Sequence, residues 1–388
     1  MKGAANYIST KEIHEILDGY GKDITVVTAA SHSAIQIIKG AKEEKLRTAL
    51  VCDRRREKLY KSFQKSKPDT FVYINKWDDF LSRDVQDELL EMSAVVIPHG
   101  SFVEYIKPEN LLNKCYVPQF GNRRTLHWES DRSKQREWLE GKAGLKMPKQ
   151  YKLDEIEEGK LAIVKFGGAK GGKGFFKIKS RDEADKILDE MEKNNEITKK
   201  ERAGITVQEY IAGSRYYHHF FFSPLDKKHE WQVEVEGRKM GRLELNGMDR
   251  RDETNIDDLH RTDLNPTERK KAGIKPSYTV CGNIPLVMRE SLLTDVMKMG
   301  DKTVRASLEL FQGGMIGPFC LETFVTSDLE HVVFEISTRI VAGTNIYPQG
   351  SPYAAYDWGE RAEMSMGRRI AREIRCAART KRLKEVVM

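Results

Sequence analysis

The stretch KFGGAKGGKGFF, at Lys165–Phe176, decides which fold the sequence predicts. The apolar run LAIV precedes it at Leu161–Val164, and a second strand-like run follows it at Phe175–Ile178. The glycines are therefore predicted to lie in a strand–loop–strand hairpin and not in a strand–loop–helix unit. Glycine tolerates positive φ and lets backbone N–H groups approach a phosphate, and the interleaved lysines add positive charge. The stretch predicts a flap that closes over a nucleoside triphosphate.

This hairpin matches neither of the two familiar glycine-rich phosphate motifs. The chain has no Gly-x-x-x-x-Gly-Lys-Ser/Thr run, and no helix is predicted after the loop. A P-loop and a dinucleotide-binding fingerprint are therefore both unsupported. From this stretch alone, the alternative is a flexible surface hairpin whose lysines keep it soluble.

Size and composition describe a chain of several domains. Its 388 residues are too many for one ordinary core, so two or three domains are expected. No apolar run approaches the roughly 20 residues of a bilayer span, and the first residues lack an apolar signal core, which predicts a cytoplasmic protein without membrane contact. The five cysteines are scattered without C-x-x-C spacing. That pattern fits a reducing compartment and argues against a zinc site or a disulfide framework.

The net charge of +7 is a mild excess of 66 basic over 59 acidic residues. The dense basic run lies near the C-terminus, at Arg368–Lys384, with apolar residues at helical spacing between the charges. This pattern predicts an amphipathic terminal helix with a solvated basic face. We therefore expect anionic small molecules, and not nucleic acid, as the partners that explain the charge.

The N-terminal third alternates apolar runs with helical segments, which predicts a doubly wound parallel sheet. Ligands of such sheets bind beyond the carboxyl ends of the strands, where the loops Ser31–Ser33 and His99–Ser101 are placed. The predicted strands are Ile24–Thr28, Thr48–Cys52, Thr70–Ile74 and Ala94–Pro98. Beyond residue 122 the pattern of apolar and charged residues changes. A charged helix is predicted over Arg123–Lys142 and a protruding hairpin over Lys227–Gly241.

Two carboxylates, Glu322 and Glu335, each end an apolar strand-like run. The polar Thr326–Asp328 between them reads as a hairpin turn, so adjacent antiparallel strands could present both carboxylates on one face. Like charges at that separation repel unless a cation lies between them, and Mg²⁺ accepts one or two carboxylates together with phosphate oxygens and water. The alternative is that both are solvent-facing strand residues.

A glycine–lysine hairpin, a strand ending in QEYI at Gln208–Ile211 and two late acidic strand positions together resemble the ATP-grasp superfamily. The resemblance implies an α/β and α+β architecture, an ATP-grasp fold preceded by a doubly wound, Rossmann-like domain. The ATP contacts that it implies come from Lys165, Lys173, Gln208, Glu209, Tyr210 and Ile211. Glu322 and Glu335 would ligate Mg²⁺, or Mn²⁺, bridging the phosphates.

The resemblance also implies a division of the chain. Residues 1–122 would form the N-terminal substrate-binding domain, residues 123–204 the small ATP-grasp subdomain with the flap, and residues 205–388 the subdomain with the metal ligands. One position departs from the pattern. Many members have Asn two residues after the second metal-binding Glu, where this chain has Ser337, and Asn345 is the candidate replacement.

Six further motifs occur in order along the chain and resemble the archaeal formate-dependent FAICAR synthetases, the PurP family. The resemblance extends from about residue 22 to the C-terminus, and the Lys227–Gly241 segment looks like an addition to the family core. The motifs are TAASHSA at Thr28–Ala34, PHGSF at Pro98–Phe102, FGNRR at Phe120–Arg124, GNIP at Gly282–Pro285, GPFCLE at Gly317–Glu322 and RIVAGTN at Arg339–Asn345.

This resemblance implies an ATP-dependent carbon–nitrogen ligase of purine biosynthesis. It would convert 5-aminoimidazole-4-carboxamide ribonucleotide (AICAR), formate and ATP to the formylated product FAICAR, ADP and phosphate, through formyl phosphate. His32, Ser101 and Asn283 would contact AICAR, Glu253 would lie near ATP, and His32 and Lys165 would serve catalysis. A homo-oligomer is also implied. Two alternatives stay open: an ATP-grasp paralogue acting on a different carboxylate or amine, and a nucleotide-binding protein without catalysis.

Overall fold

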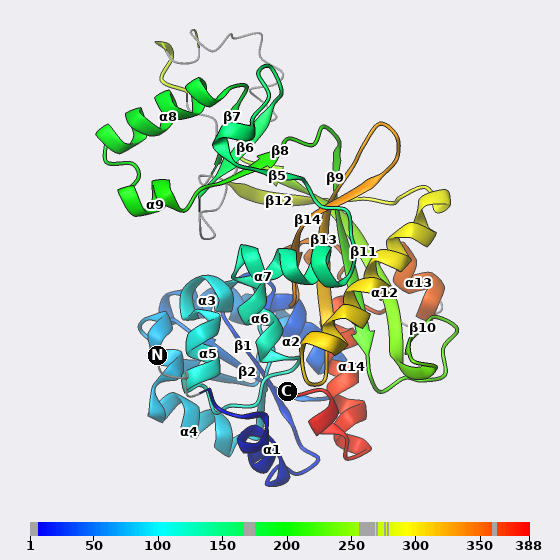
Figure 1. Ribbon diagram of the computed structural model, residues 1–388. Helices are drawn as coiled ribbons and strands as arrows, with labels where there is room; N and C mark the ends of the chain where they lie inside the picture. Colours follow the sequence, from blue (N-terminus) through cyan, green and yellow to red (C-terminus); the bar gives the residue numbers. More distant parts are fainter. Residues whose placement is uncertain are drawn as a thin grey trace.

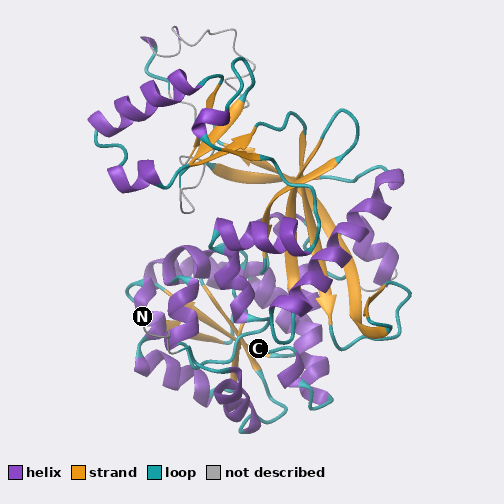
Figure 2. Ribbon diagram, viewed as in Figure 1, coloured by secondary structure: helices purple, strands orange, loops and turns teal. Residues whose placement is uncertain are grey.

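The computed structural model describes residues 7–166, 175–255, 268, 271–274, 277, 279–358 and 363–388. Figure 1 shows a lower α/β unit, a large antiparallel sheet beside it, and a small sheet with two helices above them. Figure 2 shows the strands of the three sheets in three separate places, with helices around the strands of the lower unit. No helix in the described ranges is both long and apolar enough to cross a bilayer.

The lower unit is the predicted doubly wound sheet. All four strands are parallel, in the order β3-β2-β1-β4, so the chain changes direction of winding between β1 and β4. The burial of all five β1 side chains fits a strand covered on both faces. The elements are α1 (Thr10–Asp18), β1 (Thr25–Ala29), α2 (Ala34–Glu43), β2 (Arg47–Cys52), α3 (Arg54–Ser62), β3 (Thr70–Tyr73), α4 (Arg83–Glu91), β4 (Ala94–Val96) and α5 (Pro108–Lys114).

The large sheet is built around the aromatic strand β9 (Ser214–Ser223), in the order β10-β11-β9-β13-β14, with β12 pairing β11. Phe220 and Phe222 are buried in one apolar core and Phe221 in another. The period-2 alternation of a strand therefore explains an unbroken run of buried aromatic residues. Its other elements are β10 (Gln232–Val235), β11 (Arg238–Glu253), β12 (Val280–Pro285), α12 (Leu293–Leu310), β13 (Gly317–Val325), β14 (His331–Ser337) and α13 (Pro352–Trp358).

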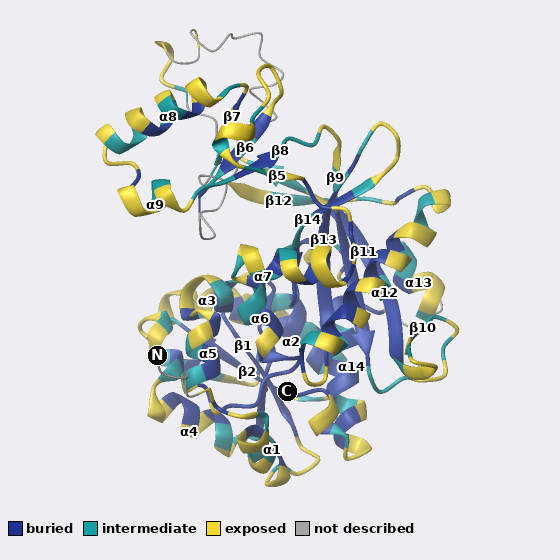
Figure 3. Ribbon diagram, viewed as in Figure 1, coloured by how far each residue is buried: buried dark blue, intermediate teal, exposed yellow. Residues whose placement is uncertain are grey.

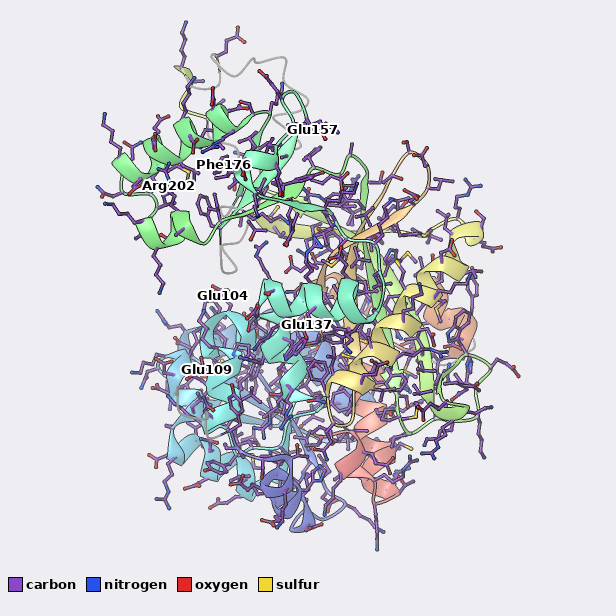
Figure 4. The ribbon with its side chains drawn as sticks, in the orientation of Figure 1. Glu104, Glu109, Glu137, Glu157, Phe176 and Arg202 are labelled. Carbon is purple, nitrogen blue, oxygen red and sulfur yellow. The ribbon has the colours of Figure 1, made fainter. Side chains whose placement is uncertain are left out.

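The upper unit contains the glycine-rich hairpin. Its sheet has the order β5-β8-β6-β7, and β6 and β7 pair antiparallel, with Lys165 opposite Phe175 at the open end. The loop and Lys173 lie outside the described residues. Figure 4 labels Phe176 and Arg202 in this unit, well separated from Glu104 and Glu109 of the lower unit. Its elements are β5 (Gln150–Tyr151), β6 (Ala162–Lys165), β7 (Phe175–Ile178), α8 (Arg181–Lys193), α9 (Lys199–Ala203) and β8 (Thr206–Glu209).

Two predictions of local structure were wrong. The charged segment Arg123–Lys142 is not one helix, because it divides into α6 (Arg123–Glu129), α7 (Arg132–Arg136) and a wider helical turn. The Asp131 carboxylate accepts hydrogen bonds from two backbone N–H groups and so begins a new helix. The hairpin predicted over Lys227–Gly241 forms, because β10 pairs antiparallel with the start of β11, but it does not protrude as predicted, since Val233 of β10 is fully buried in the core of the large sheet.

The basic C-terminal helix, α14 (Met366–Arg379), packs against α2, and its basic face is not solvated as predicted. Arg369 is buried between Glu244 and Glu373. Three further arginines surround one buried carboxylate, Glu44 of the segment after α2. Figure 3 shows a mixture of buried and exposed residues in α14, whereas α8 and α9 are largely exposed. Glu373 belongs to the same helix, but Glu44 and Glu244 come from distant parts of the chain, so the helix by itself gives no sign of these two counter-charges.

Candidate active site

The carboxylates of Glu322 and Glu335 are direct partners in the β13–β14 ladder. Partners of an antiparallel pair project to the same face, so the predicted juxtaposition is present. Glu322 is fully buried, and its Oε1 contacts Nη2 of Arg251, whereas its Oε2 has no hydrogen-bond partner. Burial raises the pKa of Glu322 above its ordinary value, the Arg251 guanidinium opposes this shift, and Glu335 reinforces it.

These two carboxylates fit a hard divalent cation. A buried carboxylate oxygen without a partner costs free energy that a cation would recover. Within the described ranges, no group of three or more His, Cys, Asp or Glu side chains is arranged to hold a metal. Two carboxylates alone suit Mg²⁺, which commonly takes the rest of its ligands from phosphate oxygens and water.

Lys165 ends β6 and faces the same region from the upper unit. The pKa of Lys165 is lowered to about 8. Burial is the main cause and the charge of Arg132 adds to it, whereas the charges of Glu335 and Glu322 raise this pKa. The ammonium group is thus close enough to both carboxylates to feel their charge. The small sheet therefore brings Lys165 within electrostatic range of the carboxylate pair on the large sheet.

The predicted adenine segment joins the small and large sheets. Gln208 and Glu209 end β8, and Tyr210 and Ile211 lead into β9. The N–H groups of Glu209 and Tyr210 already donate to the carbonyls of Lys149 and Leu161, at 2.8 and 3.3 Å. These two N–H groups are therefore committed to the sheet, and the Glu209 carboxylate also accepts a hydrogen bond from the N–H of Lys149 at 3.2 Å.

Glu253 ends β11 and approaches this segment. Its Oε1 accepts a hydrogen bond of 2.5 Å from Nη1 of Arg215. The Tyr210 phenol acts on the same guanidinium, because it contributes to raising the pKa of Arg215. The structure thus brings Glu253 and Tyr210, which lie apart in the sequence, into the surroundings of one arginine.

A second half of the site lies where the winding of the parallel sheet reverses. The loops after β1 and β4 meet there, at the position where open α/β sheets bind ligands. The rings of His32 and His99 stack with centroids 5.3 Å apart and planes within 2°. His32 has a φ of 52°, and its Nδ1 lies 2.8 Å from Oγ of Ser33.

The protonation state of His99 follows from its contacts. Its Nε2 lies 2.9 Å from the Ala29 carbonyl oxygen and must donate, while its Nδ1 accepts from the N–H of Ser101 at 3.2 Å. Burial lowers the pKa of His99 to about 4. Burial also lowers the pKa of His32, and the charges of His99, Arg339 and Arg251 add to this effect. Both rings are therefore neutral at pH 7.

The segment after β14 connects the two halves of the site. Ile340 forms a bridge with His99, and Nδ2 of Asn345 donates to the backbone oxygen of His32 at 3.2 Å. Oδ1 of Asn345 accepts a hydrogen bond from Gln36 at 2.8 Å. Both ends of the Asn345 amide are thus used, one by the His32 loop and the other by helix α2. Asn345 therefore supports that loop, and the suggestion that it joins the carboxylate pair finds no support in its contacts.

Asn283, on β12, is held by a buried network that sequence reasoning did not find. Nδ2 of Asn283 donates to Oδ2 of Asp249 at 2.7 Å, and Nε2 of His219 donates to Oδ1 of the same carboxylate at 2.7 Å. Two arginines, Arg251 and Arg339, were also missed as members of the site. Both arginines are close to predicted site residues in the sequence, since Arg339 begins the RIVAGTN motif and Arg251 lies two residues before Glu253. The side chains that they contact could not be identified from the sequence.

Comparisons with known proteins identify the family of the chain. Two family models match, a protein of unknown function (DUF1246) over residues 26–151 and a domain of unknown function (DUF1297) over residues 183–388. The chain is 47% identical over 379 residues to the 5-formaminoimidazole-4-carboxamide-1-(beta)-D-ribofuranosyl 5'-monophosphate synthetase of Methanococcoides burtonii, covering 97% of this chain and 98% of that protein. The corresponding synthetase of Ignicoccus hospitalis is 46% identical, with 94% and 96% covered.

Solved structures give the same result at the level of the fold. The crystal structure of an IMP biosynthesis protein PurP from Thermococcus kodakaraensis matches with a TM-score of 0.69 and 31% identity, covering 94% of this chain and 100% of that one. An ADP complex of an N5-carboxyaminoimidazole ribonucleotide synthetase matches with a TM-score of 0.60 and 14% identity, covering 92% and 78%. At that identity, the second similarity concerns the fold alone.

Proposed function

Because the chain belongs to the family of 5-formaminoimidazole-4-carboxamide ribonucleotide synthetases, the PurP family, we propose that it formylates AICAR with formate and ATP, releasing FAICAR, ADP and phosphate. The comparisons confirm the predicted family and the predicted ATP-grasp fold. The observation that carries the proposal is the meeting of two half-sites. The carboxylate pair with Lys165 supplies a place for ATP, and the His32–His99 stack lies at the switch point of the parallel sheet beside it.

The ATP half of the site would use charged groups of the two sheets. Lys165 and Lys173 would neutralise phosphate oxygens, and Gln208–Ile211 with Glu253 would hold the nucleoside. Glu322 and Glu335 would hold Mg²⁺ or Mn²⁺, which supplies positive charge to the phosphates when bound. The fit rests on the buried, unpartnered Oε2 of Glu322.

The AICAR half would use His32, Ser101 and Asn283. His32 is neutral and fixed by its stack on His99, so it can hydrogen-bond an uncharged group of the substrate without a change in protonation. Asn283 is oriented by Asp249. These fixed positions reduce the entropy lost when the substrate amine is aligned with its target.

The chemistry requires activation of formate, because hydroxide is a poor leaving group. A formate oxygen attacks the γ-phosphorus of ATP, the bond from that phosphorus to the β–γ bridging oxygen breaks, and ADP leaves. The exocyclic amine of AICAR then attacks the formyl carbon, phosphate leaves with the C–O bonding electrons, and the nitrogen loses a proton. Positioning and charge neutralisation carry the first step, so no protein nucleophile is required.

The proposal is tested with purified protein, ATP, Mg²⁺ and AICAR, with and without formate. We expect FAICAR and ADP in equal amounts, and only when formate is present. ADP formation with a different carboxylate or amine, and none with this set, would replace the proposal with the paralogue alternative. Nucleotide binding without turnover of any tested set would replace it with the non-catalytic alternative.

Two statements about the setting belong to the same proposal. We expect a cytoplasmic protein, since its substrates are soluble metabolites, and a homo-oligomer, as the family resemblance implies. Light scattering on the eluting protein gives the molar mass directly. A mass of one chain, 44.6 kDa, would contradict the second statement.

The pKa of Lys165 predicts a pH dependence. In the free protein this pKa is lowered to about 8, so the ammonium group is charged below that pH and neutral above it. A phosphate ligand favours the charged form. The value of kcat/KM for ATP should therefore fall about tenfold per pH unit above pH 8, and Lys165→Arg should remove this break because arginine stays protonated. A wild-type profile that stays flat through about pH 9 would contradict the prediction.

Gly100 makes a second prediction about the AICAR half. A Cβ at this position would lie 2.8 Å from Nε2 and 2.9 Å from Cδ2 of His32. Gly100→Ala should displace the His32 ring and raise KM for AICAR about 10-fold or more, with KM for ATP unchanged. Gly141→Ala is the control, since a Cβ there meets nothing within 4 Å. Steady-state kinetics with each substrate varied in turn decides the point, and equal effects of both variants would refute it.

A further inference from the structure

Arg251 is the charged side chain of the site that the proposed roles leave unused. It lies on β11, opposite Asn283 of β12 in the ladder. One of its guanidinium nitrogens contacts Glu322, and its guanidinium carbon lies 4.1 Å from the centre of the Tyr217 ring. Its side chain keeps 30% of its exposure, so it borders the open part of the site and is not sealed in the core.

The contacts of this guanidinium and its place in the sheet put it between the two half-sites, because it pairs with Glu322 and its residue lies opposite Asn283 in the ladder. It acts on the carboxylates, because both Glu322 and Glu335 raise the pKa of Arg251. It also acts on the AICAR half, because its charge contributes to lowering the pKa of His32. A formate ion must occupy this same interval, since one of its oxygens attacks the γ-phosphorus and its carbon is then attacked by the AICAR amine.

A second guanidinium in this interval, Arg339, is already committed. Its Nη2 lies 2.9 Å from Oε1 of Glu129, a carboxylate that is itself buried. The other oxygen of Glu129 accepts from the backbone N–H and the hydroxyl of Thr338. Arg339 is therefore held by a buried carboxylate and its unpartnered Nε is itself buried, whereas Arg251, within the described ranges, has Glu322 as its hydrogen-bonding partner and keeps part of its side chain exposed.

The contacts of Arg251 leave donors for a small carboxylate. Tyr217 covers one face of the guanidinium, and stacking of this kind leaves the N–H edges free. Of five N–H donors, Glu322 accepts from one nitrogen. If Glu322 bound a cation, it would interact less strongly with Arg251. The carboxylate of formate, which has the same charge and shape, could then take the place of Glu322 at the guanidinium.

We propose that Arg251 forms the formate subsite and holds the carboxylate of formate, and then the formyl phosphate made from it, between the γ-phosphate and the AICAR amine. This inference rests on the proposed function. Arg251 stays protonated throughout and exchanges no proton or bond with the substrates. Its contribution is to position the attacking oxygen and to balance its charge.

The test compares Arg251→Met and Arg251→Lys with Arg250→Met. Arg250 is the neighbouring residue on the same strand and is exposed, so it matches the charge change without entering the site. We expect Arg251→Met to raise KM for formate about 100-fold, with KM for ATP and AICAR within about threefold of wild type. Arg251→Lys should give an intermediate value, because lysine keeps the charge and loses the planar fork. Arg250→Met should change none of the three constants.

A binding measurement separates this role from support of Glu322. With ADP and Mg²⁺ present, ¹³C-formate should show line broadening with wild type and Arg250→Met, and none with Arg251→Met of unchanged unfolding temperature. If Arg251→Met and Arg251→Lys instead raise the Mg²⁺ or ATP requirement and leave KM for formate unchanged, Arg251 serves Glu322 and the inference is wrong. Absence of formate-dependent product with the wild type would overturn the proposed function itself, which is a different result.

Discussion

Glu335→Gln is expected to lower formate-dependent turnover about 1,000-fold while leaving the affinity for AICAR within about twofold. Glu335 is the ladder partner of Glu322, and the two carboxylates together provide the negative charge that would hold the cation at the ATP phosphates. Replacing one of them with an uncharged amide of the same shape removes half of that charge. AICAR would bind through the loops after β1 and β4 and through Asn283, which this substitution does not touch.

The measurement uses two readouts, initial rates of FAICAR formation and calorimetric titration with AICAR. Glu330→Gln is the matched control on the same hairpin. Its carboxylate pairs with Lys146 at the surface, where both side chains are more than half exposed, so an effect on turnover is not expected. Turnover of Glu335→Gln within about tenfold of wild type would show that the carboxylate pair is not the cation site.

Arg369→Met is expected to destabilise the protein by about 3–5 kcal/mol, the largest effect on stability that we predict. Nε and Nη2 of Arg369 lie 2.8–3.0 Å from the Glu244 carboxylate, and Nη1 lies 2.8 Å from Glu373. All three side chains are at most 5% exposed. Removing the arginine leaves Glu373 without this counter-charge and Glu244 with the more distant Arg242, at 3.6 Å, and methionine restores the packing against Phe221 only in part.

Denaturant unfolding followed by circular dichroism gives the free energy difference. Arg379→Met is the control, because this arginine is exposed in the last turn of the same helix. Surface substitutions of this kind change stability by about 0.5 kcal/mol or less. Equal stabilities of Arg369→Met and Arg379→Met would mean that the C-terminal helix is held by its apolar face alone, through residues such as Ile370 and Ile374.

The features predicted correctly from the sequence depend on local patterns. The hairpin β6–β7 follows from two short apolar runs around glycines, and the Glu322–Glu335 pair follows from two strands joined by a short turn. The parallel sheet follows from apolar runs that alternate with helices. In each case the decisive contacts join residues close in the chain or obey a strong rule of topology.

The wrong predictions concern charges whose partners are distant. The C-terminal arginines were placed in solvent because their helix supplies one carboxylate, Glu373, which pairs with Arg369, and most of the other partners lie far away in the chain. The distant partners are Glu44, more than three hundred residues earlier, and Glu244 on β11. The broken helix at Asp131 is a different case, since a capping aspartate was present in the sequence and its effect was underestimated.

The sequence by itself determined the family, the fold and the two half-sites, because the glycine-rich hairpin, the late glutamates and the ordered motifs are each encoded within a short segment. Only the tertiary structure decided how the half-sites are joined. Arg251 reaches Glu322 across 71 positions, Asn345 supports the loop of His32 across 313, and Asp249 orients Asn283 across 34. Such contacts depend on register and burial in sheets that assemble from remote strands, and those are properties of the folded chain.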